Sequence, residues 1–108
     1  MPPNARDQMM LDELAMLRRD MRLIKYRQGR LEHVVNRYDH RIGASLSKQH
    51  QRVLIQRQAK VRAELELLAV ELADTRLTYR NKCTDAKLRG LITDNDIIRW
   101  LGEDYAQA

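Results

Sequence analysis

The chain has 108 residues, which is enough for one domain. Charged residues make up 32% of it, with only four glycines, two prolines and no phenylalanine. This composition is typical of long helices or coiled coils and argues against a β-sandwich, a β-barrel or a doubly wound sheet. The formal net charge of +5 favours acidic partners over basic ones.

The first predicted element is a long helix that follows a short N-terminal flank, residues 1–9, which holds both prolines. Apolar side chains then recur at alternating spacings of four and three residues from Met10 to Ile42, with one polar exception at Gln28. This spacing is the a/d pattern of a heptad repeat. The sequence therefore predicts an uninterrupted helix with a single apolar seam.

A break at residues 43–47 separates this helix from a second one. Gly43 suits the left-handed position that often ends a helix, and Ser45 or Ser47 is a suitable N-cap for the next helix. The heptad pattern then resumes and runs to about residue 89, again with one glutamine, Gln58, in the seam, and Gly90 is the expected stop. Residues 10–89 are therefore predicted to form an antiparallel two-helix coiled-coil hairpin, because a short loop joins antiparallel neighbours.

The two seams match if the chain folds back between Ala44 and Ser45. In that register Leu31 lies opposite Gln58, Ile24 lies opposite Leu65, and Gln28 occupies the layer next to Gln58. Two interpretations of the glutamines stay open. They hydrogen-bond to each other and fix the register, or both lean out to solvent.

The C-terminal segment, residues 90–108, is predicted to form a short third helix and a tail. Thr93 is the expected N-cap of a helix from Asp94 to Leu101, and Asp96 stands three residues after it, where it completes a capping box. Gly102 is the expected end of this helix.

A second apolar stripe on the far side of the second predicted helix is left without a partner by the hairpin. The third helix folding back near Val70–Leu77, a second copy of the chain, or both together are expected to cover it. The overall expectation is an all-α chain that assembles into a helical-bundle dimer or ring. The predicted oligomer interface consists of Ala63, Leu67, Val70, Ala73, Leu77, Ile97, Trp100 and Leu101.

Charge is concentrated in the middle of the chain, where residues 18–62 carry thirteen basic and three acidic side chains. In the hairpin this block gathers toward the turn, and the acidic residues gather toward the open end. Such a density of positive charge predicts binding to a polyanion. The candidate nucleic-acid-binding residues are Arg18, Arg19, Arg22, Tyr26, Arg30, Arg37, Arg41, Lys48 and Arg52.

These features lead to one hypothesis for function and one alternative. The hypothesis is an oligomeric, non-enzymatic assembly factor that grips nucleic-acid phosphates without sequence specificity; small viral and mobile-element DNA-handling proteins have this size and composition. The alternative is a structural adaptor or scaffold coiled coil whose arginines bind an acidic protein surface and no nucleic acid. No recognition-helix, zinc-finger or RNA-binding aromatic motif accompanies the basic block.

Catalytic, metal and cofactor sites are not predicted, nor is a small-molecule substrate. Ser45 and Ser47 are interpreted as caps, and His33 and His40 stand seven residues apart on one helix, about 10.5 Å, too far to share one ion. No apolar run approaches the ~20 residues that span a bilayer, and no signal-peptide core follows Met1. With a lone Cys83 we expect a cytoplasmic protein, or a virion-associated one if it is viral.

Overall fold

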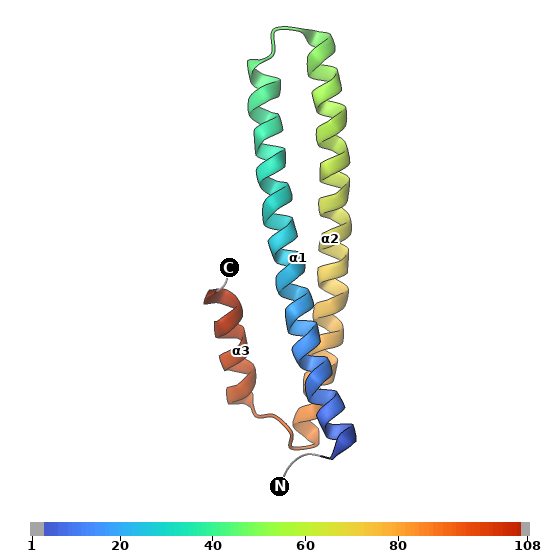
Figure 1. Cartoon of the computed structure of the whole chain (residues 1–108), viewed down its shortest axis with the longest axis vertical. Helices are drawn as coiled ribbons and strands as arrows, with labels where there is room; N and C mark the ends of the chain where they lie inside the picture. Colours follow the sequence, from blue (N-terminus) through green and yellow to red (C-terminus); the bar gives the residue numbers. More distant parts are fainter. Residues whose placement is uncertain (1–3, 107–108) are drawn as a thin grey trace.

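The computed structural model describes residues 4–106, with side chains described for residues 4–102, and it is all-α in this range. Helix α1 spans Ala5–Ala44, α2 spans Lys48–Leu88 and α3 spans Asp94–Ala106. The two long helices pack as an antiparallel hairpin, and the described part of the chain is extended, 69 × 22 × 17 Å. The short α3 turns back and lies beside the N-terminal half of α1 (Figure 1).

The turn lies slightly later in the chain than the heptad pattern predicts. Helix α1 continues through Gly43 to Ala44, so the prediction that Gly43 ends it in a left-handed conformation is wrong. Ser45 is extended instead, and its backbone N–H donates to the carbonyl oxygen of Ile42. Ser47 caps α2 as predicted, because its hydroxyl oxygen accepts from the backbone N–H of His50.

The later turn shifts the register of the hairpin by about one helical turn. Gln58, predicted to face Leu31, donates from Nε2 to the carbonyl oxygen of Val35 at 3.1 Å and to Oδ1 of Asp39 at 2.6 Å. Gln58 is buried, so these two acceptors satisfy its amide nitrogen across the helix pair. Neither predicted role for this glutamine holds: it does not lean out to solvent, and its described partners lie on α1 nearer the turn than Gln28.

Near the turn, a second cross-helix bond agrees with this register. Gln51 donates to the carbonyl oxygens of Ile42 at 3.2 Å and Ser45 at 2.9 Å. These carbonyls stand at the end of α1, where backbone acceptors have no intrahelical donor. A side chain of α2 therefore closes the end of α1 and fixes how the helices meet.

The hydrophobic core is concentrated toward the open end of the hairpin. One cluster joins Met21 and Ile24 of α1 to Leu68 and Leu72 of α2, so Ile24 packs nearer the C-terminus of α2 than its predicted partner Leu65. A second cluster is built around Leu14, which is fully buried. The turn half has fewer buried side chains, with Leu54 and Gln58 as its main ones.

The second cluster is completed by the C-terminal segment. Leu14 of α1 packs with Cys83 and Ala86 of α2 and with Ile92, which precedes α3. Trp100 of α3 packs against the same cluster. This burial holds α3 on the hairpin.

The chain leaves α2 through the glycine stop that the sequence predicts. Gly90 has a φ of 73° and donates to the carbonyl oxygen of Lys87, while Leu91 donates to that of Ala86. These two bonds form a Schellman motif, which satisfies two of the last carbonyls of the helix.

Helix α3 starts at its predicted capping box. The backbone N–H of Thr93 donates to the Asp96 carboxylate at 2.9 Å, and the backbone N–H of Asp96 donates to the Thr93 hydroxyl oxygen at 3.3 Å. The helix then passes through Gly102, where the sequence predicts its end, and continues to Ala106.

The position of α3 differs from the prediction that it covers the second stripe of α2. It packs on Leu14 and Cys83, and Leu67, Val70 and Leu77 stay 71%, 60% and 57% exposed. Trp100, predicted as an oligomer contact, instead packs within the chain. Trp100 also lies over Arg18, a contact between distant residues that a heptad pattern does not reveal.

Candidate nucleic-acid interface

The turn half of the hairpin carries an exposed and largely unneutralised set of basic side chains. Of the ion pairs among the described side chains, only Arg62 with Asp39, at 3.9 Å, lies in this half. The others lie at the open end, where Lys82 pairs with Glu13 at 2.5 Å between α2 and α1, while Arg99 pairs with Asp96 within α3. The positive charge near the turn therefore faces solvent with few described counter-charges.

Four arginines of α1 form a row along one face of this half, and we call them the arginine row. They are Arg27, Arg30, Arg37 and Arg41, all exposed. Their spacings of three, seven and four residues keep them on one side of a helix over about 21 Å. None of the described carboxylates lies within ion-pair distance of these guanidinium groups.

Two shallow grooves lie along the arginine row and share Val34 and Arg37 among their lining residues. One, of about 400 Å³, is lined by Arg27, Arg30 and Arg37 together with Glu64 of α2. The other, of about 360 Å³, is lined by Arg37, Arg41 and Tyr38. The row therefore borders two neighbouring grooves whose lining is partly apolar, and we call them together the furrow.

Helix α2 adds positive charge beside the same furrow. Glu64 lines it, and Arg57 stands seven residues earlier on the same face of α2. Arg57 and Lys60 are both exposed and lie closer to the turn than Glu64. Glu64 is therefore the carboxylate that lines the furrow, and it lies at the part of the furrow nearer the middle of the hairpin.

Two tyrosines stand next to arginines of the row. The guanidinium carbon of Arg30 lies 5.9 Å from the centroid of the Tyr26 ring, and that of Arg41 lies 6.0 Å from the Tyr38 ring. Both distances are at the outer limit of a cation–π contact. Tyr26 is exposed, so its ring is accessible for stacking.

The nine predicted binding residues do not form one surface. Arg30, Arg37, Arg41 and Tyr26 come together on or beside the arginine row. Arg27, which the prediction omits, completes that row. Arg27 stands three residues before Arg30, and residues three apart lie on the same side of a helix. The sequence alone could therefore have identified it.

The remaining predicted residues lie elsewhere. Arg19 is exposed and shares the side of α1 that carries the arginine row, because it stands 18 residues before Arg37, but it lies about 12 Å beyond Arg27 toward the open end. Lys48 and Arg52 are exposed at the start of α2. Arg18 and Arg22 are only half exposed and lie in the half of the hairpin where α3 packs.

Arg18 has a structural role that removes it from any solvent-facing surface. Its guanidinium carbon lies 3.8 Å from the centroid of the Trp100 ring, and its Nη1 is buried with no hydrogen-bond partner among the described atoms. Cys83 is buried close by, and this burial raises the pKa of its thiol, opposed by a hydrogen bond with Tyr79 and by the charge of Arg18. The thiol is therefore kept protonated and shielded.

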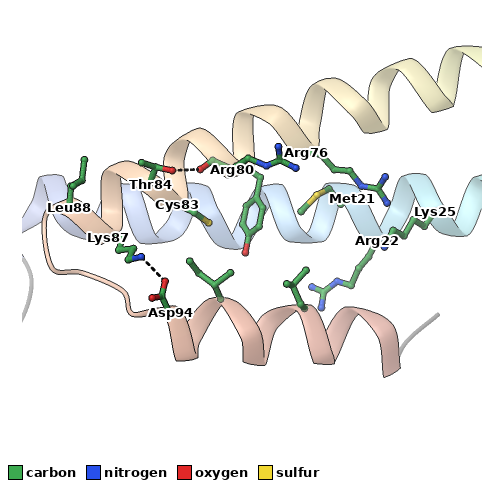
Figure 2. A pocket seen from close by; sticks show the side chains of 13 residues that line it. Met21, Arg22, Lys25, Arg76, Arg80, Cys83, Thr84, Lys87, Leu88 and Asp94 are labelled. Carbon is green, nitrogen blue, oxygen red and sulfur yellow. Dashed lines mark hydrogen bonds and ion pairs between the residues drawn. The ribbon is translucent and has the colours of Figure 1, made fainter.

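A larger groove lies between α2 and α3, with α1 as its floor (Figure 2). Its volume is about 970 Å³. Apolar side chains and basic side chains line it together, and among its described lining residues Asp94 is the single acidic one. The basic ones are Arg22, Lys25, Arg76, Arg80 and Lys87.

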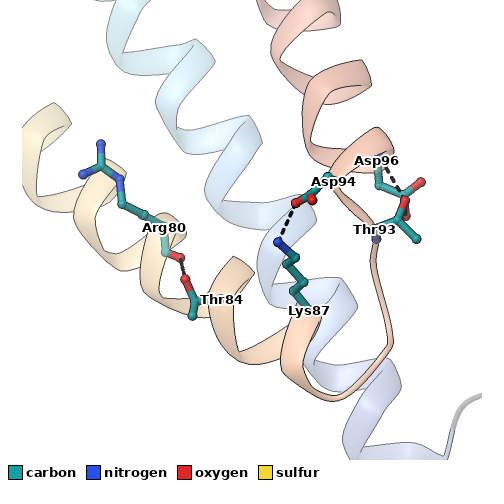
Figure 3. Close-up of polar contacts among 6 residues, drawn as sticks. All are labelled: Arg80, Thr84, Lys87, Thr93, Asp94 and Asp96. Atoms are coloured by element: carbon teal, nitrogen blue, oxygen red, sulfur yellow. Dashed lines mark hydrogen bonds and ion pairs between the residues drawn. The ribbon is translucent and has the colours of Figure 1, made fainter.

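The wall of this groove that α3 provides is held by polar contacts at the start of the helix (Figure 3). Lys87 of α2 pairs with Asp94 at 2.7 Å, and the Thr93–Asp96 capping box follows directly. Arg76 and Arg80 of α2 stand on the opposite wall, and no described carboxylate lies within ion-pair distance of either.

Other kinds of site are not formed by the described residues. No three histidine, cysteine or carboxylate side chains among them are arranged to hold a metal ion. In residues 4–106, no helix has both the length and the apolar character to cross a bilayer. Comparisons with protein-family models, curated proteins and solved structures found no match to the chain.

Proposed function

We propose that the arginine row is a phosphate-binding surface and that the protein binds nucleic acid through it without reading sequence. The single observation that carries this proposal is the row itself: four exposed guanidinium groups on one face over about 21 Å, with no described carboxylate within ion-pair distance and only Glu64 beside them. Guanidinium groups form bidentate hydrogen bonds with phosphate oxygens.

The dimensions of the row suit a nucleic-acid backbone. Duplex DNA carries one phosphate charge per about 1.7 Å of its axis, so a 21 Å row runs alongside several phosphates of either strand. The exposed ring of Tyr26 offers a stacking platform for an unpaired base. No recognition-helix, zinc-finger or RNA-binding aromatic motif accompanies the row, so binding is expected to depend on phosphate contacts.

The test is the salt dependence of binding to a random-sequence duplex, measured by fluorescence anisotropy. Each phosphate contact contributes about 0.9 to the slope of log affinity against log salt concentration. The double variant Arg30→Gln/Arg37→Gln should therefore lower that slope by about 2. The matched control Arg6→Gln/Arg99→Gln removes the same charge from the open end and should leave the slope almost unchanged.

The outcomes separate this function from the adaptor alternative. No binding of duplex or single-stranded nucleic acid at ~50 mM salt, where phosphate contacts are strong, would refute the proposal. If the slope of log affinity against log salt concentration is the same for both double variants, the arginine row does not contact the phosphates. Retained binding to an acidic polypeptide such as polyglutamate, with no binding to nucleic acid, would favour the adaptor.

A role in assembly and a cytoplasmic or virion location complete the proposal. The location agrees with the free thiol of Cys83, which a reducing compartment preserves. An assembly factor also requires self-association, and the exposed stripe on α2 offers a surface for it.

A further inference from the structure

The groove between α2 and α3 is bridged by an ion pair at one end and is basic at the other. At the bridged end, Lys87 of α2 pairs with Asp94 of α3 at 2.7 Å. At the other end stands Arg76, which precedes Lys87 by eleven residues and so lies about 16.5 Å away along α2. The two ends of the groove therefore differ in charge.

Helix α1 adds two further basic side chains at the end where Arg76 stands (Figure 2). They are Arg22 and Lys25, which line the groove. Their neighbour Met21 packs with Leu72, which is one turn before Arg76 on α2. Three of the five basic residues in the described lining therefore gather at this end, which we call the basic end.

The lining between the two ends is largely apolar. Tyr79 and Cys83 line this middle part from α2, and Ile97 and Leu101 line the groove from α3. The groove volume of about 970 Å³ is at the upper limit of the range of about 300–1,000 Å³ that is usual for small-molecule sites. The groove thus combines an apolar interior with a few polar groups placed at one end, as such sites do.

We propose that this groove binds a long-chain fatty acid, with its carboxylate at Arg76 and its alkyl chain on the apolar lining toward Lys87. A guanidinium group can hold a carboxylate through two parallel hydrogen bonds. None of the described ion pairs involves Arg76 or Arg80, and Figure 2 shows Arg80 extending along α2 toward Arg76. Both guanidinium groups therefore stand where the head group would lie.

The length of the groove sets the length of the chain that fits it. A fully extended chain advances about 1.2 Å per bond, so about twelve to fourteen carbons span the distance from Arg76 to Lys87. Each methylene group that leaves water for the apolar lining adds to the affinity.

The charge pattern favours this occupant over an acidic helix. Carboxylates recur along the whole length of an acidic helix, so such a partner needs basic groups at both ends of the groove. The base at the far end, Lys87, is already neutralised by Asp94, whose own carboxylate opposes a second acidic side chain. A ligand with one anionic head and an uncharged tail matches this asymmetry.

The first test is isothermal titration calorimetry with dodecanoate, at neutral pH and below the concentration at which it forms micelles. The native chain should bind dodecanoate at one saturable site. Octanoate, which is four methylene groups shorter, should bind at least about tenfold more weakly. Dodecyltrimethylammonium has the same chain with a positive head group and should not bind, because the basic end repels it.

The second test removes one charge at the basic end. Arg76→Gln should weaken dodecanoate binding by about tenfold or more, because the head group loses a charged hydrogen-bond donor. Arg52→Gln is the matched control, since it removes the same charge from the same helix near the turn, and it should leave the affinity unchanged. Both arginines are exposed, so both variants should keep their helicity, which circular dichroism verifies.

Each outcome decides for or against the fatty-acid site. Dodecanoate that does not bind, or that binds without saturation while the chain loses helicity, overturns the proposal. Equal losses for Arg76→Gln and Arg52→Gln overturn it too, because they would indicate attraction to the overall charge. Displacement of dodecanoate by polyglutamate would assign the groove to an acidic protein segment instead. The result is independent of the arginine row, since the Arg30→Gln/Arg37→Gln variant should bind dodecanoate as the native chain does.

Discussion

The contact between Trp100 and Arg18 is the feature whose loss should most clearly release α3. Trp100 packs against the cluster around Leu14, and its ring lies 3.8 Å from the guanidinium carbon of Arg18. Cys83 is buried in the same cluster and is the lone cysteine of the chain. Truncating Trp100 to alanine should therefore loosen α3 and expose one identifiable thiol.

The expected size of the effect follows from the partial burial of Trp100. A fully buried tryptophan costs about 3–5 kcal/mol when truncated to alanine. For this half-buried ring, with a cation–π contact of about 1 kcal/mol included, we expect about 2–3 kcal/mol. The equilibrium for opening of α3 should then rise roughly 30- to 150-fold.

The assay is the rate at which Cys83 reacts with an aromatic disulfide at neutral pH. In the native chain, burial both shields the thiol and raises its pKa, so the rate is limited by local opening. Trp100→Ala should increase this rate by the factor given above, and Ile98→Ala, an exposed position on the same helix, should leave it nearly unchanged. An increase below threefold for Trp100→Ala would refute the account of how α3 is held.

Three further predictions concern stability. In urea titrations, Leu14→Ala should lower the free energy of unfolding by about 3–4 kcal/mol, because Leu14 is fully buried. Leu23→Ala, at an exposed position, should lower it by less than about 1 kcal/mol, and equal losses would contradict the assigned core. Gly90→Ala should cost about 1–2 kcal/mol because the left-handed φ of 73° strains an alanine, and no measurable cost would argue against this helix stop. The backbone N–H of Thr93 holds the pKa of the Asp96 carboxyl below its ordinary 3.8, so the cap should stabilise α3 above that value and fail as the pH falls through the lowered pKa. Trp100 fluorescence should therefore shift to the red only below pH 3.8, and a shift that Asp96→Ala leaves unaltered would count against this cap.

Local signals in the sequence predicted local structure well. The Thr93–Asp96 capping box, the Ser47 cap and the Gly90 stop are all confirmed, because each depends on backbone groups within a few residues. The heptad spacing likewise predicted both long helices and their antiparallel packing.

The register was wrong because a heptad pattern repeats and so permits several alignments that differ by whole turns. The choice depended on where the turn lies, and Gly43 was a misleading signal because the helix passes through it. The cross-helix bond from Gln58 to Asp39 now fixes the alignment. It joins residues 19 positions apart, beyond the reach of any local pattern.

The candidate binding surface was only partly predictable for a related reason. Charge along the chain indicated the basic block, but α3 packs beside Arg18 and Arg22 at the open-end part of that block and takes them away from the exposed surface. The contact of Arg18 with Trp100 joins two residues that are 82 positions apart, so no local pattern reveals it. The sequence could have predicted that Arg27, Arg30 and Arg37 share one side of a helix, because this follows from helical periodicity alone.

Mapping the contact surface by nuclear magnetic resonance tests the central claim, phosphate binding by the arginine row, most directly. A short random-sequence duplex is added to isotope-labelled protein at low salt, and the shifts of backbone amides are recorded along the chain. We expect the largest shifts around the arginine row, residues 27–41, with smaller ones on the neighbouring stretch of α2 and none around Cys83 and Ile92. Shifts centred on α3 or on the groove beside it, or no shifts at all, would contradict the claim.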